Sequence, residues 1–155
     1  MPEKKTLARA RADRKAGKAP STQAGEFIRE QIEHIRKGQH GARSTRQAIA
    51  IGLSEARRAG VDLPPPASGK TSMQTRRRAV RDYARGHDQK HTSISMKRSR
   101  ATAKALKREG SRAASPEALA RHARLAASRR SPTERSEAAR RAARTRRSLA
   151  RHHAS

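Results

Sequence analysis

Cysteine and tryptophan are absent from this chain of 155 residues, and Phe27 and Tyr83 are its only phenyl-ring side chains. The absence of cysteine excludes disulfides, thiol chemistry and cysteine-ligated zinc sites. Leu, Ile, Val and Phe together number 16 residues, well under the roughly 20% below which a highly charged chain is expected to be disordered alone. We therefore expect one small helical unit with long basic segments that become ordered on a ligand.

Acidic residues are also scarce: 13 Asp and Glu stand against 39 Lys and Arg, which gives a formal net charge of +26. The excess is uneven, because residues 1–63 have a net charge of +7 and residues 64–155 a net charge of +19. Self-repulsion of this size opposes a compact state, and a polyanion relieves it while releasing counterions. Nucleic acid is therefore the expected partner.

Catalytic patterns are missing as well. No Ser–His–Asp or paired-carboxylate arrangement stands out, so we predict a protein that is not an enzyme and has no cofactor or small-molecule substrate. The segment SGKTS at 68–72 ends like a phosphate-binding loop, but Pro64 stands where that motif requires glycine. His87 and His91 have i,i+4 spacing without a third ligand, so no metal site is expected.

Long apolar runs do not occur either. No segment has the length of a membrane span, and the basic N-terminus lacks the apolar region of a secretory signal. Basic membrane-surface helices need bulky apolar faces, whereas the basic segments here offer mainly alanine. We expect a cytoplasmic protein that has no membrane partner and lies on the nucleoid if the cell is bacterial.

What is present is helical, so the predicted fold class is all-α. A helix is expected from the cap candidates Ser21 and Thr22 to Gly38, and a second one from Ser44 to Gly60. Gln47 is expected to complete a capping box with Ser44, and Val61 to pack back as in a Schellman ending. Apolar residues at helical spacing form the predicted core of this hairpin: Phe27, Ile28, Ile32, Ile35, Ile49 and Leu53.

The predicted hairpin module, residues 21–63, is short for a unit that folds alone. Ile51 projects away from the main apolar stripe of its helix. A homodimer that pairs two hairpins would give Ile51 a place to be buried, and docking of another partner is the alternative. A sequence-reading helix-turn-helix is less favoured, although Arg43–Gln47 are base-contacting residue types, because the connection is longer than the usual turn.

The rest of the chain is predicted to consist of a basic arm (1–20), a Pro/Gly/Ser linker (64–72) and a basic helical tail (73–155) that becomes ordered on its ligand. Helical pieces are expected at 73–85, 95–109, 116–130 and 132–151. The last two begin with the same device, in which Ser115 or Ser131 caps the helix and proline follows at its first position.

Arginine spacing marks the predicted nucleic-acid contacts. Arg140, Arg144, Arg147 and Arg151 follow at i, i+4, i+7 and i+11, so they share one helical face, and Arg141 lies beside them. Arg76, Arg77 and Arg78 form a second cluster. Guanidinium groups suit phosphate oxygens, and the alanines between them allow a close approach to a nucleic-acid backbone. Phosphate contacts carry no base readout, so sequence specificity is not implied.

The stretch STQAGEFIREQIEHIRKGQHGARSTRQAIAIGLSEARRAGVDLPPP resembles an uncharacterised family of small basic bacterial proteins, and the likeness extends more loosely through AARRAARTRR. The resemblance implies at most a DNA-binding or histone-like role, and no functional residues carry over from it. We expect a nucleoid-associated, architectural DNA-binding protein. An RNA- or ribosome-associated protein and a regulator that binds a partner through the 21–63 hairpin are the alternatives.

Overall fold

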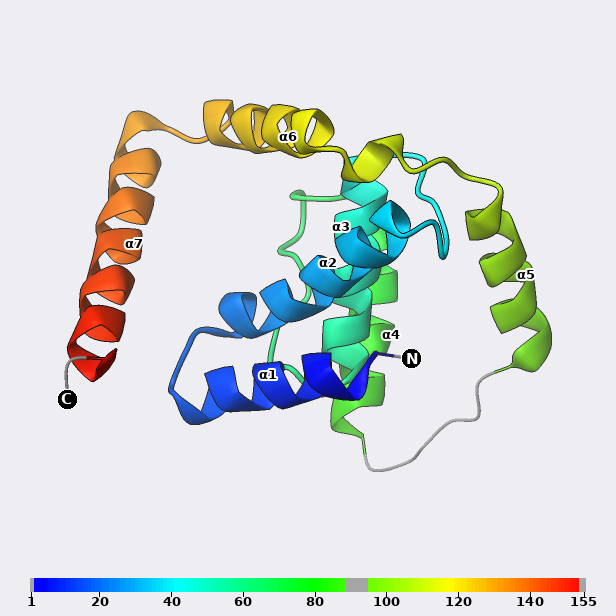
Figure 1. Ribbon diagram of the computed structural model, residues 1–155, viewed down its shortest axis with the longest axis horizontal. Helices are drawn as coiled ribbons and strands as arrows, with labels where there is room; N and C mark the ends of the chain where they lie inside the picture. The colour runs from blue at the N-terminus through cyan, green and yellow to red at the C-terminus, as the bar shows by residue number, and fades with distance from the viewer. Residues whose placement is uncertain (1, 89–94, 154–155) are drawn as a thin grey trace. The chain divides into compact units, whose positions relative to one another are not determined.

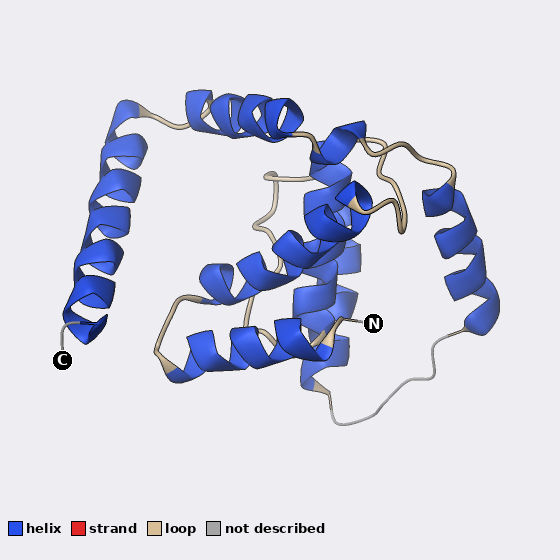
Figure 2. Cartoon of the chain, in the orientation of Figure 1, coloured by secondary structure: helices blue, strands red, loops and turns tan. Residues whose placement is uncertain are grey.

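A computed structural model describes residues 2–88 and 95–153, and the side chains of residues 2–88 and 95–147. These residues form helices, turns and loops without strands, which confirms the all-α fold class (Figure 2). The elements in chain order are α1 (Lys4–Lys15), α2 (Pro20–Arg36), α3 (Thr45–Arg58), α4 (Met73–His87), α5 (Met96–Lys107), the 3-10 turn η1 (Arg112–Ala114), α6 (Pro116–Ser128) and α7 (Pro132–His153). The helical pieces expected along the tail lie where α4 to α7 are found (Figure 1).

The chain divides into two compact units, Met1–Ala118 and Leu119–Ser155. In the first unit, α2 packs on α3, α1 packs on α2, and α4 packs on α3. The second unit consists of most of α6 and all of α7. Among its described residues, none is buried.

The helix ends follow their expected chemistry with two differences. Ser44 Oγ accepts from the Gln47 amide at 3.2 Å, and Gly38 and Gly60 have φ of 70° and 83°, the left-handed conformation of a Schellman ending. The Gln47 side chain accepts from the Arg43 amide at 2.7 Å instead of the Ser44 amide. The expected caps Ser21 and Thr22 are wrong, since Ala19 precedes the helix and Pro20 takes a first-turn position.

The residues predicted to form the core of the hairpin are buried to different extents. Phe27 and Ile35 are fully buried and Ile32 is buried, whereas Ile28, Ile49 and Leu53 are partly exposed. One cluster of the core combines residues of α1, α2 and α3 with the segment after α3: Ala10, Ala24, Phe27, Ala56 and Val61, with Leu7, Leu53 and Leu63 packed against it. Large apolar residues are few, so small alanines fill much of this core.

Residues 4–15, expected to be part of a basic arm, form α1 and bury Thr6 and Ala10. The segment therefore contributes to the core as well as to the charge. Sequence periodicity gave little indication of this packing, because its apolar side chains are one leucine and several alanines. Ile51, for which a second copy was expected to provide burial, is already partly buried within the single chain.

α4, which follows the proline-rich linker, also packs on α3 of the hairpin. Ala79 is buried, the Ser54 hydroxyl donates to Asp82, and the Tyr83 hydroxyl donates to Asp62 at 2.5 Å. At the other end of α3, η1 is anchored by Thr45 Oγ1, which donates to the Ala113 carbonyl at 2.7 Å. α4 and η1 are thus attached through hydrogen bonds and contacts of small residues. Neither kind of contact requires a stripe of large apolar residues that could be recognised in the sequence.

Candidate nucleic-acid interface

The outward side of α4 carries a row of guanidinium groups. Ala79 faces α3, and Arg77, Arg81 and Arg85, at i, i+4 and i+8, lie about half a turn away from it. All three are exposed, as are the predicted contact residues Arg76 and Arg78. The row spans about 12 Å at 1.5 Å per residue. Sequence reasoning identified the adjacent cluster 76–78 but missed Arg81 and Arg85, whose i,i+4 spacing was the available signal.

α5 presents a second row that the sequence analysis also missed. Its members follow at i, i+3, i+7 and i+10, fall within one arc of the helix, and are all exposed: Lys97, Arg100, Lys104 and Lys107. No residue of α5 is buried. The helix is tied to the hairpin at its C-terminal end, where the Gly41 amide donates to the Leu106 carbonyl at 2.9 Å. The free side of α5 is thus available to a large ligand.

α7 carries the row that was predicted. Ser131 and Glu134 begin the helix with a reciprocal capping box: Ser131 Oγ accepts from the Glu134 amide at 3.2 Å, and Glu134 Oε2 accepts from the Ser131 amide at 2.7 Å. Arg140, Arg144 and Arg147 are exposed and share a face, with exposed Arg141 about 100° around the helix. The side chain of Arg151 lies outside the described residues.

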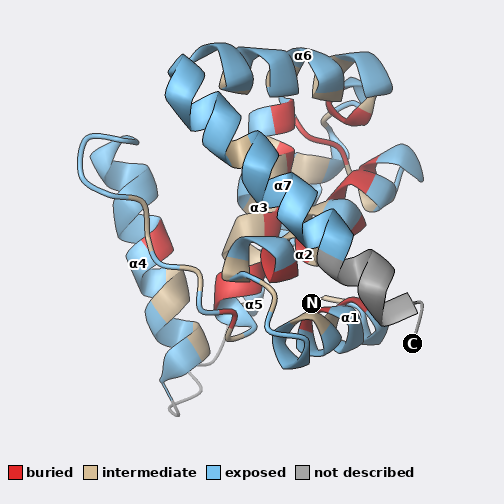
Figure 3. Cartoon of the chain, turned by 90° about the vertical axis from the view of Figure 1, so that its left-hand side faces the viewer, coloured by how far each residue is buried: buried red, intermediate tan, exposed pale blue. Residues whose placement is uncertain are grey.

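Basic side chains of residues 3–37 are used differently. Glu26 Oε2 lies 3.7 Å from Arg9 and 3.4 Å from Arg29, Lys18 contacts Asp13 at 2.7 Å, and Lys37 lies 3.9 Å from Glu33. Acids therefore offset part of the positive charge in this part of the first unit. Figure 3 shows the contrast in burial, with buried segments gathered on α2 and α3 and exposed surface along α7.

Arg57 is a structural arginine rather than a contact residue. It is buried, and its guanidinium donates to the carbonyls of Leu63 and Pro64 at 3.1 and 3.3 Å. Burial lowers the pKa of Arg57, while Asp82 acts in the opposite direction. The group thus fixes the path of the chain into the proline-rich linker.

The start of α3 is occupied by internal contacts, which disfavours the helix-turn-helix interpretation. Thr45 is buried against η1, and Ser44 and Gln47 make the cap described above. Arg36 Nε donates to the Ala114 carbonyl at 2.9 Å and so closes the same corner. Of the five base-contacting residue types, Arg43, Ser44 and Arg46 are exposed, and Ser44 is already used as the helix cap.

A polar network crosses the face between α2 and α3. Gln31 donates to Glu55 at 2.7 Å and contacts His40 Nε2 through its amide oxygen at 3.1 Å. Burial raises the pKa of the Glu55 carboxyl, and the negative charge of Glu30 raises it further. The hydrogen bond with His34 lowers the pKa of the exposed Glu3 carboxyl. The network therefore contains three carboxyl groups, those of Glu3, Glu30 and Glu55, whereas the rows on α4, α5 and α7 carry positive charge.

His87 and His91, the pair considered as metal ligands, do not form a metal site within the residues that the structure describes. His87 stacks on Tyr83 with ring centroids 4.0 Å apart, and its Nδ1 lies 2.8 Å from the Tyr83 carbonyl oxygen. His91 lies outside the described residues. A different group of ligand types, Glu3, Glu30 and His34, is brought together at the start of α1 and on α2. The i,i+4 spacing of Glu30 and His34 is the signal of this group in the sequence, and it was missed there.

None of the helices in the described parts of the chain has the length and apolar content needed to cross a bilayer. Residues 3–66 match the family described as "Family of unknown function (DUF6496)", which confirms the resemblance to an uncharacterised family. The match covers α1, α2 and α3 and ends at the last proline of the linker. No curated protein and no solved structure matches the chain.

Proposed function

We propose that this protein is a non-enzymatic, largely sequence-independent nucleic-acid-binding protein that favours DNA and acts as an architectural component of the nucleoid in the cytoplasm. The supporting observation is the set of exposed basic rows on α4, α5 and α7, in helices that bury almost nothing. Such rows follow a phosphate backbone, and the alanines between the cations allow close contact. Histone-like behaviour in this sense means binding through charge and shape without base recognition.

DNA is favoured over RNA because the rows are straight, helical and poor in aromatic side chains. Single-stranded nucleic acid is usually held by stacking on aromatic rings, and this chain has only Phe27, which is buried, and Tyr83, which stacks on His87. Structured RNA stays the second candidate, since arginine-rich helices also bind its phosphates. Rows on several helices of one chain would allow two duplexes to be bridged.

The test is equilibrium binding of the full chain to a duplex DNA and to a structured RNA of equal charge, across a salt series. Contacts to roughly 6–10 phosphates should weaken DNA binding about 10³–10⁵-fold between 50 and 200 mM salt. A nearly flat salt response would refute the proposal. A preference for RNA that persists at physiological salt would instead indicate an RNA- or ribosome-associated protein.

Two linked expectations follow from the same proposal. The basic tail should gain helicity when DNA is added, which circular dichroism at low salt measures directly. A homodimer through the hairpin, or docking of a regulatory partner there, has less free apolar surface to use, because α1 and α4 already pack on α2 and α3. A monomeric mass by light scattering at high micromolar concentration would exclude the homodimer.

A further inference from the structure

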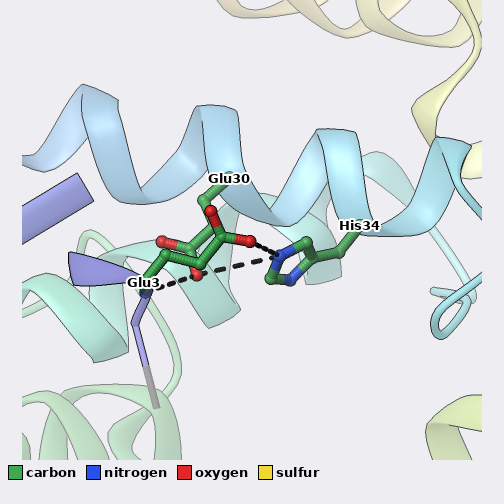
Figure 4. Close-up of side chains that lie close together, drawn as sticks. All are labelled: Glu3, Glu30 and His34. Atoms are coloured by element: carbon green, nitrogen blue, oxygen red, sulfur yellow. Dashed lines mark hydrogen bonds and ion pairs between the residues drawn. The ribbon is translucent and has the colours of Figure 1, made fainter. Parts of the chain in front are cut away.

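Three side chains with metal-ligand chemistry converge where the N-terminal segment meets α2. Glu30 and His34 lie one turn apart on α2, and Glu3 immediately precedes α1. His34 Nε2 lies 2.9 Å from Glu3 Oε1 and 3.9 Å from Glu30 Oε1. The three ligand atoms all fall within 4.8 Å of one another. Figure 4 shows the two carboxylates side by side, with the ring nitrogen of His34 directed toward them.

Glu30 is the unusual member of the group, because it is 5% exposed. Its Oε1 accepts from the Glu3 amide at 3.0 Å, whereas Oε2 is buried without a hydrogen-bond partner among the described residues. A buried carboxylate is costly unless a cation or several hydrogen bonds compensate it. Arg29, the neighbour of Glu30 in the sequence, and Arg9 of α1 contact Glu26 rather than Glu30.

We propose that Glu3, Glu30 and His34 bind one divalent transition-metal ion of the Zn²⁺ type. Ligand atoms about 2.0–2.1 Å from a tetrahedral zinc lie about 3.3 Å from each other. The observed separations of 2.9 and 3.9 Å fall on either side of that value, so small side-chain rotations would admit the ion. One imidazole and two carboxylates suit Zn²⁺ and related ions, while Mg²⁺ and Ca²⁺ prefer oxygen ligands alone.

The role of the ion is structural. It would place a cation beside the buried carboxylate of Glu30, whose Oε2 has no hydrogen-bond partner among the described residues, and it would fasten Glu3, and with it the start of α1, to α2. Water would complete the coordination on the exposed side, where the Glu3 side chain is 54% exposed. The site is independent of the nucleic-acid proposal, since two of its ligands are acids and none of its ligands belongs to α4, α5 or α7.

The experiment is calorimetric titration of the metal-free full chain with Zn²⁺, accompanied by thermal melting with and without the ion. One equivalent should bind and raise the melting temperature. Glu30→Gln, which preserves shape, and Glu3→Gln, at an exposed position, should each weaken binding at least about tenfold. The matched control Glu33→Gln removes an exposed acid from the same helix and should leave binding unchanged.

Three results would overturn the proposal. These are no binding by the wild-type chain, equal binding of Mg²⁺, and Zn²⁺ binding that survives both Glu3→Gln and His34→Gln. In the first case, the contacts of His34 with the two glutamates would be the whole function of the cluster. In the last case, Zn²⁺ would be held by other histidines of the chain.

Discussion

The helices α1 to α3 and the helices α4 to α7 all contain alanine and arginine, yet they are used in different ways. Residues 1–63 hold ten of the sixteen Leu, Ile, Val and Phe residues and seven of the thirteen acids. There, Phe27 and Ile35 are fully buried, and several charges form ion pairs. In α4, only Ala79 is buried, and in α5 and α6 no residue is. A few well-placed isoleucines and glutamates thus separate a folding region from a binding surface.

The largest effect should come from emptying the core of the first region. Phe27 is fully buried, so Phe27→Ala should cost about 3–5 kcal/mol of unfolding free energy. Met73, which is 62% exposed on α4, gives the contrast: Met73→Ala should change stability by under about 0.5 kcal/mol. Urea unfolding followed by circular dichroism measures both. Equal losses would show that α4 belongs to the core as fully as α2 does.

A glycine pair tests how closely α2 and α3 approach. A Cβ added to Gly52 would lie 2.7 Å from Ile28 Cα, whereas one added to Gly25 would meet nothing within 4 Å. Gly52→Ala should therefore destabilise the protein by about 1–3 kcal/mol through overpacking. Gly25→Ala should stabilise it by up to about 1 kcal/mol, because alanine is the better helix former. Thermal melts that move in the same direction would contradict this helix crossing.

Two serine caps with the same chemistry compare the regions directly. Ser44 caps α3 and Ser131 caps α7, each accepting from an amide at 3.2 Å. Each Ser→Ala change should cost its own helix about 1 kcal/mol. Ser44→Ala should lower the midpoint of cooperative unfolding, because α3 is packed on α2 and α4. Ser131→Ala should reduce helicity alone, and an equal shift of the midpoint would mean that α7 is part of the cooperative unit.

The smallest effect concerns pH and is confined to the first region. Burial, with the charge of Glu30, raises the pKa of Glu55 above its ordinary 4.5, so the folded state holds this proton more tightly than the unfolded chain does. The stability contributed by Glu55 is then fully present below pH 4.5 and is lost as pH rises through the folded-state pKa. Glu55→Gln should therefore stabilise the protein at pH 7 and lose that advantage below pH 4.5. A constant difference across pH, measured by urea unfolding, would remove Glu55 as the cause.

Helix-level features were predictable because their signals are local. The Ser44, Gly38, Gly60 and Ser131 boundaries follow from capping chemistry, and Phe27 and Ile35 follow from helical periodicity. The packing of α1 and α4 was not predictable in this way. It rests on Ala10 and Ala79, which give no distinctive pattern, and on hydrogen bonds between residues far apart in the chain, such as Tyr83 with Asp62.

The candidate site divides in the same manner. The arginine row on α7 was predictable from the spacing of its residues along the helix. The same spacing rule would also have predicted the rows on α4 and α5. The convergence of Glu3 on Glu30 and His34 depends on where α1 packs, so only half of that group could be anticipated from the sequence. Contacts between polar residues that are far apart in the chain produce no periodic pattern in a single sequence.

In the proposed function, the basic rows, and not total charge, bind the nucleic acid. The most direct measurement compares the salt dependence of duplex DNA binding for two triple variants, each of which loses three positive charges. One changes Arg140, Arg144 and Arg147 of α7 to Gln, and the other changes Arg9, Arg29 and Lys37, which are paired with Glu26 and Glu33. We predict that the α7 variant loses about 0.9 of salt slope for each phosphate contact removed, while the control stays close to wild type. Equal losses in the two variants would contradict the account, because charge alone would then explain the binding.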